Sequence, residues 1–269
     1  MTEFAINDRL ANYGDGLFTT MRVKNHKIAL FARHLARLQH NARRLGIRLN
    51  TDQLTEAMRN QAQTLGEGTL KLLISAGAGG RGYKRDATST PGLHFSGSPY
   101  PAHYPQWQSA GISVGLSSVT LARQPALAGL KHTNRLEQVL IKQAMPDQVD
   151  DVLVCDTQGI LIEASAANVF WRTGNRWYTP DLSYSGVAGV MREFVLAQFS
   201  GNGSGCETGQ YGTGSLTHAS NVFICNALMQ IVPVHTLQFN NQTLRFSIDE
   251  VLTLQRQWQP AFQDEYDTF

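Results

Sequence analysis

The stretch LAGLKHTNRLEQ, residues 127–138, places one lysine, Lys131, between an apolar approach that contains glycine and a segment that reads as the start of a helix. A lysine at such a junction is ordinarily a solvated surface charge. In a partly desolvated pocket, burial disfavours the charged form of the amine, and a neutral amine is a good Schiff-base nucleophile. Both interpretations are open from this stretch alone.

The composition bounds the class of protein. With 269 residues, 42% of them hydrophobic, the chain is long enough to bury a sizeable core, and two domains are expected. Lys and Arg number 23 and Asp and Glu number 21, so the formal charge of +2 offers no basic stripe that would track a phosphate backbone. Nucleic acid is therefore not expected as a partner.

Signals for membranes, metals and disulfides are missing from the sequence. No window approaches the roughly 18 apolar residues of a membrane span, and the first residues lack a secretory layout, so a soluble cytoplasmic protein is expected. The histidines form no HxxxH or HExxH pattern, and no metal site is predicted. The three cysteines show no CxxC spacing, and Cys155 and Cys225 are expected to be reduced and buried.

The first hundred residues predict a small α/β domain. In residues 31–46 apolar side chains recur every three or four positions and Gly46 follows, which predicts a helix and its end. Residues 51–66 repeat this pattern, with Thr51 or Asp52 as the N-cap and Gly66 as the stop. A hairpin around a polar KNHK turn and two further strands are predicted at residues 16–31, 69–75 and 92–97.

The second half predicts a larger domain with a different pattern. The proline-rich segment SPYPAHYP cannot continue a strand ladder and reads as the connection. We therefore predict an α+β protein with a smaller domain at 1–98, a linker at 99–107 and a larger domain at 108–269 that carries the lysine. Its predicted strands are 111–119, 151–156, 160–163, 168–180 and 221–225, and its predicted helices are 134–145 and 186–199. Residues 201–220 are rich in glycine and serine and predict a flexible surface loop.

The sequence GAGGRG at residues 77–82 matches the GxGxxG dinucleotide pattern but lacks its context. That pattern has to open a helix, whereas the polar, proline-ended YKRDATSTPG follows here. A glycine loop that brings Arg81 to an anionic ligand fits better, because guanidinium binds carboxylates bidentately. An exposed loop arginine is equally compatible with the spacing.

A Schiff-base lysine would need two kinds of partner for a pyridine cofactor with a phosphate group. Glu163, at the end of the strand ILIE, could bind the pyridinium nitrogen, although an edge carboxylate in water is the alternative. Arg37 on the HLARL helix could bind the phosphate, together with amides where GVAGVMREF begins a helix. The cleft between two domains is the default place for such a small-molecule site.

These motifs together resemble the fold-type IV pyridoxal-phosphate enzymes, the superfamily of the branched-chain and D-amino-acid aminotransferases. The resemblance covers nearly the whole chain, in eight segments in register: NDRLANYGDGLFTTMRV, HLARL, LLISAGAGGRGY, SPYPAHY, LAGLKHTNRLEQ, LIEASAANVFW, GVAGVMREF and ICNALMQIVPV. It implies the two-domain fold of that superfamily, pyridoxal 5'-phosphate as cofactor, and a homodimer with the site near the subunit interface.

The resemblance also implies a reaction. GDGLFTT, GGRGY, SPYPAHY and KHTNRLEQ favour a carbon–oxygen lyase that converts 4-amino-4-deoxychorismate to 4-aminobenzoate and pyruvate in folate biosynthesis. An aminotransferase for branched-chain or D-amino acids is the alternative, because it would use the same lysine, carboxylate and phosphate-binding arginine. A non-catalytic binding protein that has kept the fold is a third reading, which the intact Lys131, Glu163 and Arg37 oppose.

Site roles follow from the resemblance position by position. Lys131, in the family's K-x-x-N setting with Asn134, is expected to be the Schiff-base lysine and the acid/base, and Glu163 is expected to pair with the pyridine nitrogen. The phosphate is expected to contact residues from three segments: Arg37, Val190, Met191 and Asn226. The substrate is expected to lie near residues from four others: Arg81, Tyr104, Arg135 and Thr20, with Thr19 as the alternative to Thr20.

The sequence departs from the family at its start. The family usually has a further short strand and an I-N-G turn ahead of the segment that matches FAINDR, residues 4–9, and this sequence begins almost there. Either that strand is absent or the true start lies upstream.

Overall fold

The chain is described by a computed structural model that covers residues 5–79, 82–86, 88–201, 205–239 and 242–267. It divides into two compact units. Unit 1 comprises Met1–Tyr100, Leu130–Arg135 and Phe262–Phe269. Unit 2 comprises Pro101–Gly129 and Leu136–Ala261. The predicted domain ranges are contiguous, whereas unit 1 collects three separate stretches of chain.

Unit 1 is built on an antiparallel sheet with strand order β2-β1-β3-β4. Its strands are β1 (Gly16–Lys24), β2 (Lys27–Ile28), β3 (Gly68–Ser75) and β4 (Gly92–Ser98). Alternate residues of β1 and β3 face the core, with Leu17 opposite Ile74 and Met21 opposite Leu70. This period of two places Thr19 on the same face of β1 as these apolar residues.

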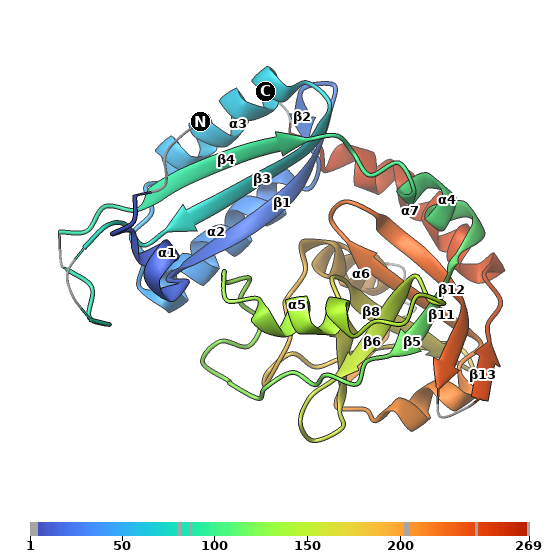
Figure 1. Ribbon diagram of the computed structural model, residues 1–269. Helices are drawn as coiled ribbons and strands as arrows, with labels where there is room; N and C mark the ends of the chain where they lie inside the picture. Colours follow the sequence, from blue (N-terminus) through green and yellow to red (C-terminus); the bar gives the residue numbers. More distant parts are fainter. Residues whose placement is uncertain (1–4, 80–81, 87, 202–204, 240–241, 268–269) are drawn as a thin grey trace. The chain divides into compact units, whose positions relative to one another are not determined.

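Two helices cover that face of the sheet (Figure 1): α2 (Phe31–Leu45) and α3 (Thr51–Leu65). Gly46 and Gly66 follow them, both with positive φ, as the sequence predicted. The predicted N-cap of α3 was wrong. Asn50 caps this helix by accepting a hydrogen bond from Gln53 N–H, one residue before the predicted Thr51 or Asp52. A short helix, α1 (Arg9–Tyr13), was not predicted.

The two distant stretches join unit 1 through main-chain and charged contacts. Phe18 N–H donates to Lys131 O at 3.0 Å, which ties residues 130–135 to β1. At the C-terminal end, Asp267 N–H donates to Ile28 O at 3.0 Å, and its carboxylate accepts two hydrogen bonds from Arg59, each 2.9 Å long. These partners are more than 100 residues apart in sequence, which is why no local pattern could reveal them.

Unit 2 contains a larger mixed sheet in the order β10-β9-β8-β11-β12-β5-β6-β7, with β13 paired to β12. Its strands are β5 (Ile112–Leu116), β6 (Asp151–Cys155), β7 (Leu161–Ala164), β8 (Asn168–Thr173), β9 (Arg176–Pro180), β10 (Cys206–Gly209), β11 (Asn221–Asn226), β12 (Gln230–Phe239) and β13 (Gln242–Arg245). Its helices are α4 (Tyr104–Ala110), α5 (Leu136–Gln143), α6 (Val190–Gly201), the 3-10 helix η1 (Thr213–His218) and α7 (Asp249–Asp264).

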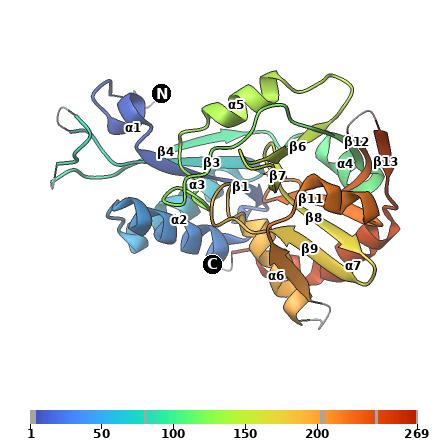
Figure 2. The same cartoon turned by 90° about the horizontal axis from the view of Figure 1, so that it is seen from below.

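Helix α6 packs on one face of this sheet (Figure 2). The ring of Phe199 contacts Phe170 of β8 and Trp177 of β9, and Trp258 of α7 meets it edge-on at 4.9 Å. Phe199 and Phe170 are fully buried, so apolar packing holds the helix against the sheet. This packing fixes the position at which the N-terminus of α6 begins.

Two sequence predictions for unit 2 were wrong. The described part of residues 201–220 is not a plain surface loop, because β10 pairs in parallel with β9 and η1 buries Leu216 in the core; residues 202–204 lie outside the described residues. Cys155 is only partly buried, although Cys225 is buried as expected. Within the described ranges, no helix is long and apolar enough to span a membrane.

Candidate functional site

The lysine stretch is held on β1 by its own side chains and main chain. His132 forms a bridge with Leu17, next to the bond between Phe18 N–H and Lys131 O. The Thr133 hydroxyl donates to Gly14 O at 2.6 Å, and Asn134 Nδ2 donates to the same oxygen at 2.9 Å. The main chain around Lys131 is therefore fixed by contacts on both sides.

Arg135 folds back onto this stretch. Its Nε donates to His132 O and its Nη2 donates to Leu130 O, both at 2.8 Å. These two carbonyls flank Lys131, so the guanidinium braces the loop that presents the lysine. The predicted contact between Arg135 and substrate stays a prediction.

The amine of Lys131 lies in a partly desolvated place. Its Nζ is 4.3 Å from the centroid of the Phe18 ring, and the residue is half-buried. The neighbouring His132 has a pKa lowered to about 4. Burial is the largest cause, and the positive charges of Arg135 and Lys131 add to it. His132 is thus neutral at physiological pH.

Arg37, the predicted phosphate-binding arginine, lies in a small polar cluster between α2 and β1. Its Nη2 donates to the hydroxyl of Thr19 at 2.7 Å, and that oxygen is also 2.7 Å from Nδ1 of His34. Both Thr19 and His34 are fully buried. Burial, followed by the charges of Arg37 and Lys131, lowers the pKa of His34 well below its usual value, so both cations act on one buried neutral ring.

Glu163 lies in unit 2, on strand β7, with 6% of its surface exposed. Its Oε2 accepts a hydrogen bond from Val187 N–H at 2.9 Å. Gly186 has a φ of +82°, and a Cβ there would lie 3.2 Å from the same carboxylate oxygen. The carboxylate is therefore buried against a backbone segment that requires glycine.

The same segment leads into helix α6. Gly129 N–H donates to Gly186 O, and Ala188 N–H donates back to Gly129 O, each at 3.0 Å. Asn168 Nδ2 donates to Val187 O at 2.9 Å, and a Cβ on Gly189 would collide with the Asn168 side chain. Together these contacts place the first turn of α6.

Val190 and Met191 are the first residues of α6 and are buried at 1% and 2% exposure. The first amides of a helix have no intrahelical acceptor and favour an anion. The side chain of Asn226 stabilises the turn that follows it, because Oδ1 accepts hydrogen bonds from Leu228 N–H and Met229 N–H. Its Nδ2 donates to Ala166 O at 3.1 Å. Its predicted part in phosphate binding stays a prediction.

The predicted substrate residues are spread over both units. Thr20 lies on the opposite face of β1 from Thr19. Tyr104 begins α4 in unit 2, with its ring centroid 4.6 Å from that of His103. Arg81 lies outside the described residues.

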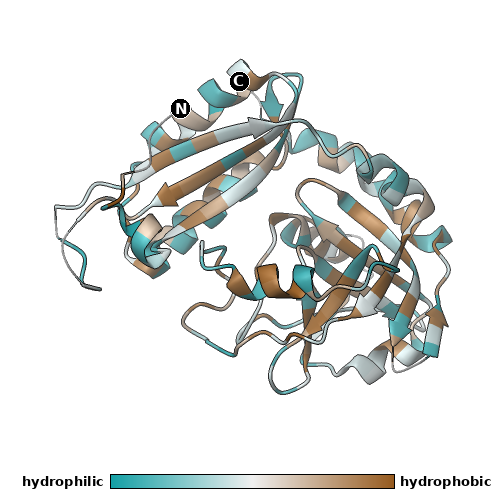
Figure 3. Cartoon of the chain, viewed as in Figure 1, coloured by the Kyte–Doolittle hydropathy of each residue, from teal (hydrophilic) through white to brown (hydrophobic). Residues whose placement is uncertain are grey.

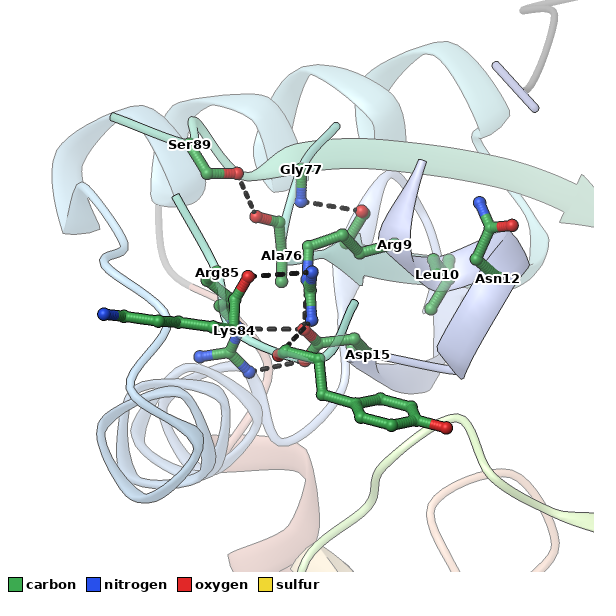
Figure 4. A network of polar contacts seen from close by, with 12 residues as sticks. Arg9, Leu10, Asn12, Asp15, Ala76, Gly77, Lys84, Arg85 and Ser89 are labelled. Atoms are coloured by element: carbon green, nitrogen blue, oxygen red, sulfur yellow. Dashed lines mark hydrogen bonds and ion pairs between the residues drawn. The ribbon is translucent and has the colours of Figure 1, made fainter. Parts of the chain in front are cut away.

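Residues 82–85 belong to a network of charges and hydrogen bonds in unit 1 (Figure 4). The Arg9 guanidinium is almost fully buried and donates to Asp15 Oδ2 at 2.8 Å, to Tyr83 O at 2.7 Å and to Gly82 O at 3.2 Å. Arg85 forms an ion pair with the same Asp15. Burial by itself raises the pKa of Asp15, but the bonds and charges of Arg85 and Arg9 outweigh it and the net pKa is lowered.

His34 and Val187 were missed by the sequence analysis. The spacing of His34 and Arg37 by three residues on one helix put them on the same face, which was a usable signal. Val187 contacts Glu163 through its main-chain N–H. Nearly every residue type has this group, so the sequence gives no signal for such a contact.

The two α+β units have the fold of the class IV aminotransferases. The chain belongs to this family: the profile described as amino-transferase class IV matches residues 16–237. Among curated proteins it is similar to an aminodeoxychorismate lyase of Vibrio harveyi, with 33% identity over 253 residues that cover 93% of each chain.

Two further comparisons extend this result. A crystal structure of 4-amino-4-deoxychorismate lyase from Pseudomonas aeruginosa superposes with a TM-score of 0.89 and 35% identity, and covers 97% of this chain and 96% of that one. A D-alanine aminotransferase of Bacillus licheniformis is 26% identical over 240 residues, which cover 86% of this chain and 82% of that one.

Proposed function

We propose that this protein is a pyridoxal-phosphate-dependent carbon–oxygen lyase that converts 4-amino-4-deoxychorismate to 4-aminobenzoate and pyruvate, a step of folate biosynthesis. The observation that carries the proposal is the full-length similarity, at 33% and 35% identity, to two proteins that bear this activity in their names. Both similarities extend over more than nine-tenths of the chain, so they include both units.

The residues present fit pyridoxal 5'-phosphate. In unit 1, the charges of Arg37 and Lys131 both contribute to the lowered pKa of the buried His34, so this region is positively charged and suits a dianionic phosphate. In unit 2, the buried Glu163 is suited to a protonated pyridine nitrogen. The first amides of α6, at Val190 and Met191, suit phosphate oxygens.

In this proposal Lys131 transfers the proton, and Glu163 stabilises the positive charge on the cofactor's ring nitrogen. When bound, pyridoxal 5'-phosphate supplies a carbonyl carbon and a ring that takes up electron density. The amine of Lys131 holds the cofactor at rest and removes the proton from the amine-bearing carbon of the substrate. Glu163 keeps a proton on the ring nitrogen. The bond to the neighbouring enolpyruvyl oxygen would then break and release enolpyruvate, which would take the proton held by Lys131 at its methylene carbon and become pyruvate; formation of the aromatic ring would make the step effectively irreversible.

The substrate carries carboxylates, and guanidinium groups bind carboxylates bidentately. We assign Arg81 to that contact, with Tyr104, Arg135 and Thr20 as further candidates. The braced geometry of Arg135 supports a role in holding the lysine loop in addition to any contact with substrate.

The proposal includes a homodimer. Leu136, Val139 and Leu140 lie three and four positions apart on α5 and are 77%, 47% and 52% exposed. Figure 3 shows that part of α5 is coloured as hydrophobic. An exposed apolar stripe of this kind supports a partner subunit. Sedimentation at micromolar concentration tests the dimer, and a monomer would contradict it.

Two further parts of the proposal concern location and domains. The three free cysteines are compatible with a reducing, cytoplasmic location, which fractionation of the source cells would test. We also keep the division into a smaller N-terminal domain, a linker at 99–107 and a larger C-terminal domain as a proposal. Limited proteolysis around residues 99–107 would test the linker.

An aminotransferase for D-amino or branched-chain amino acids is the second candidate. The similarity to the D-alanine aminotransferase favours it, and that reaction would use the same Lys131, Glu163 and Arg37. The two functions differ in one observable respect: an aminotransferase passes the amino group of an amino acid to the cofactor and leaves the cofactor in its amine form.

The decisive experiment supplies purified protein with enzymatically generated 4-amino-4-deoxychorismate and measures 4-aminobenzoate and pyruvate. Equal amounts of both products are expected. In parallel, the protein is mixed with D-alanine and the absorbance of the bound cofactor is followed. Conversion of the cofactor by D-alanine without formation of 4-aminobenzoate would replace the lyase with the aminotransferase. Failure to bind the cofactor would contradict both and leave a binding protein.

A further inference from the structure

The contact between β1 and α2 contains two polar residues that are fully buried, Thr19 and His34, beside apolar neighbours. Leu17, Met21 and Val23 face α2 and α3 from β1, and Thr19 occupies the same face among them. Opposite, His34 is a buried residue of α2, and both polar residues are 0% exposed. A valine and a leucine would satisfy the pattern better, because burial of polar groups costs free energy. A local departure of this kind indicates a functional requirement.

Thr19 and His34 are both connected to the guanidinium of Arg37. Thr19 Oγ1 is 2.7 Å from Arg37 Nη2, which donates to it, and 2.7 Å from His34 Nδ1. The single hydroxyl therefore links the guanidinium to a ring that is packed in the core. Because α2 holds both His34 and Arg37, and β1 holds Thr19, the link fixes the direction of the guanidinium against two rigid elements.

The charge state of the ring supports this role. Burial and the two nearby cations keep His34 neutral, so it can pack beside Arg37 without repelling it. In the described part of the chain, His34 Nε2 is buried without a hydrogen-bond partner. One ring nitrogen thus contacts Thr19 while the other lacks a hydrogen bond. An unsatisfied buried nitrogen costs free energy, and an apolar core residue at this position would avoid that cost.

We propose that Thr19 and His34 are positioning residues for Arg37, and that they set the preference of this protein for the phosphorylated form of its cofactor. The inference rests on the proposed function, in which Arg37 binds the phosphate. It assigns to a buried threonine and histidine an effect on phosphate binding that they exert through the guanidinium.

The test compares binding of pyridoxal 5'-phosphate with binding of pyridoxal, which lacks the phosphate, by titration of the cofactor-free full-length protein. Thr19→Val removes the hydroxyl and keeps the shape. We expect it to weaken the phosphate ester by about tenfold and to leave pyridoxal unchanged, because hydrogen bonds to charged groups are among the stronger ones. Thr19→Ser keeps the hydroxyl and should restore most of the preference.

A matched control comes from β3 in the same unit. Thr69 is 7% exposed, and its Oγ1 is buried without a hydrogen-bond partner among the described residues. Thr69→Val makes the same chemical change without reaching Arg37 and should leave both affinities unchanged. The double variant Thr19→Val with His34→Leu removes both polar groups, so the cofactor-free protein should melt at the same or a higher temperature while the phosphate preference is lost.

The outcomes separate the inference from the proposed function. If the wild type binds pyridoxal as tightly as the phosphate ester, the proposed phosphate site fails and the inference fails with it. If the wild type prefers the ester and Thr19→Val keeps that full preference, only the inference is overturned. Equal weakening of both ligands by Thr19→Val, or no rescue by Thr19→Ser, would also overturn it, because either result describes a general packing defect.

Discussion

The two units hold their candidate site residues in different ways. In unit 1, Arg37 is linked to Thr19 and His34 by contacts between side chains. In unit 2, Glu163 and Asn168 bond to the main chain of Val187. Side-chain contacts can be altered one group at a time, whereas main-chain contacts depend on the path of the backbone. In unit 1 a single side-chain substitution should therefore remove one of these contacts, whereas in unit 2 the path of the backbone at Val187 has to change before they are lost.

Lys131→Ala should have the largest effect. Loss of a nucleophile that also acts as acid and base should reduce lyase turnover by at least about 1000-fold. The fold should persist, because Phe18 N–H bonds to the main-chain oxygen of residue 131, which the substitution keeps. Product formation is measured over hours, and normal activity in this variant would refute the mechanism.

Lys71 offers the control for that variant. Its Nζ lies 5.4 Å from the centroid of the Phe18 ring, the same ring that Lys131 contacts at 4.3 Å. Lys71→Ala removes an amine of the same kind and should leave turnover near that of the wild type.

Gly186→Ala should come next and tests the backbone of unit 2. Its φ of +82° strains any L-residue, and the new Cβ would lie 2.5 Å from Ile162 Cγ2. We expect a loss of about 3 kcal/mol in the free energy of unfolding, measured in urea. Gly174→Ala has positive φ (+60°) but open space around its Cβ, so its loss should be about 1 kcal/mol. Equal losses would argue against a special constraint at Gly186.

Glu163→Gln removes the charge and keeps an oxygen that can accept from Val187 N–H. Lyase turnover should fall by about 100-fold, about 2.7 kcal/mol, because the ring nitrogen loses its anionic partner. The melting temperature should change by no more than a few degrees. A large loss of stability with intact activity would reverse the assignment of Glu163 from cofactor binding to structure.

The smallest expected effect is a pH dependence in unit 1. His34 has a lowered pKa in the folded protein, so below pH 6.5 the unfolded chain binds a proton that the native state rejects. This group therefore reduces stability as the pH falls below about 6.5, with a slope that rises toward about 1.4 kcal/mol per pH unit at lower pH. The wild type should lose stability relative to His34→Asn between pH 6.5 and 5.5, as measured by urea unfolding. Parallel pH profiles would contradict a neutral buried His34.

Much of unit 1 could be predicted from the sequence because its signals are local. The spacing of apolar residues predicted α2 and α3, and glycine predicted their ends, since a residue with positive φ ends a helix at low cost. The pairing of β10 with β9 could not be predicted in this way. It joins residues about 30 positions apart, and its register depends on the partner strand.

In the candidate site, too, local signals could be predicted and contacts between distant elements could not. Lys131, Glu163 and Arg37 were singled out by residue type within motifs. The contacts that hold them were not, because Thr19 meets Arg37 from another element and Val187 acts through its main chain. Motifs thus predicted candidate residues for the chemistry, and the structure was needed to find the contacts that orient them.

The path of the chain has a consequence for dissection of this protein into pieces. The backbone passes between the units after Tyr100, Gly129, Arg135 and Ala261. A fragment that ends at Tyr100 would lack both Phe18's acceptor on Lys131 and the Asp267 that binds Arg59. Neither unit can be released by one cut in the gene. Split-gene complementation should therefore require both fragments to be made together, with the lysine stretch present in one of them.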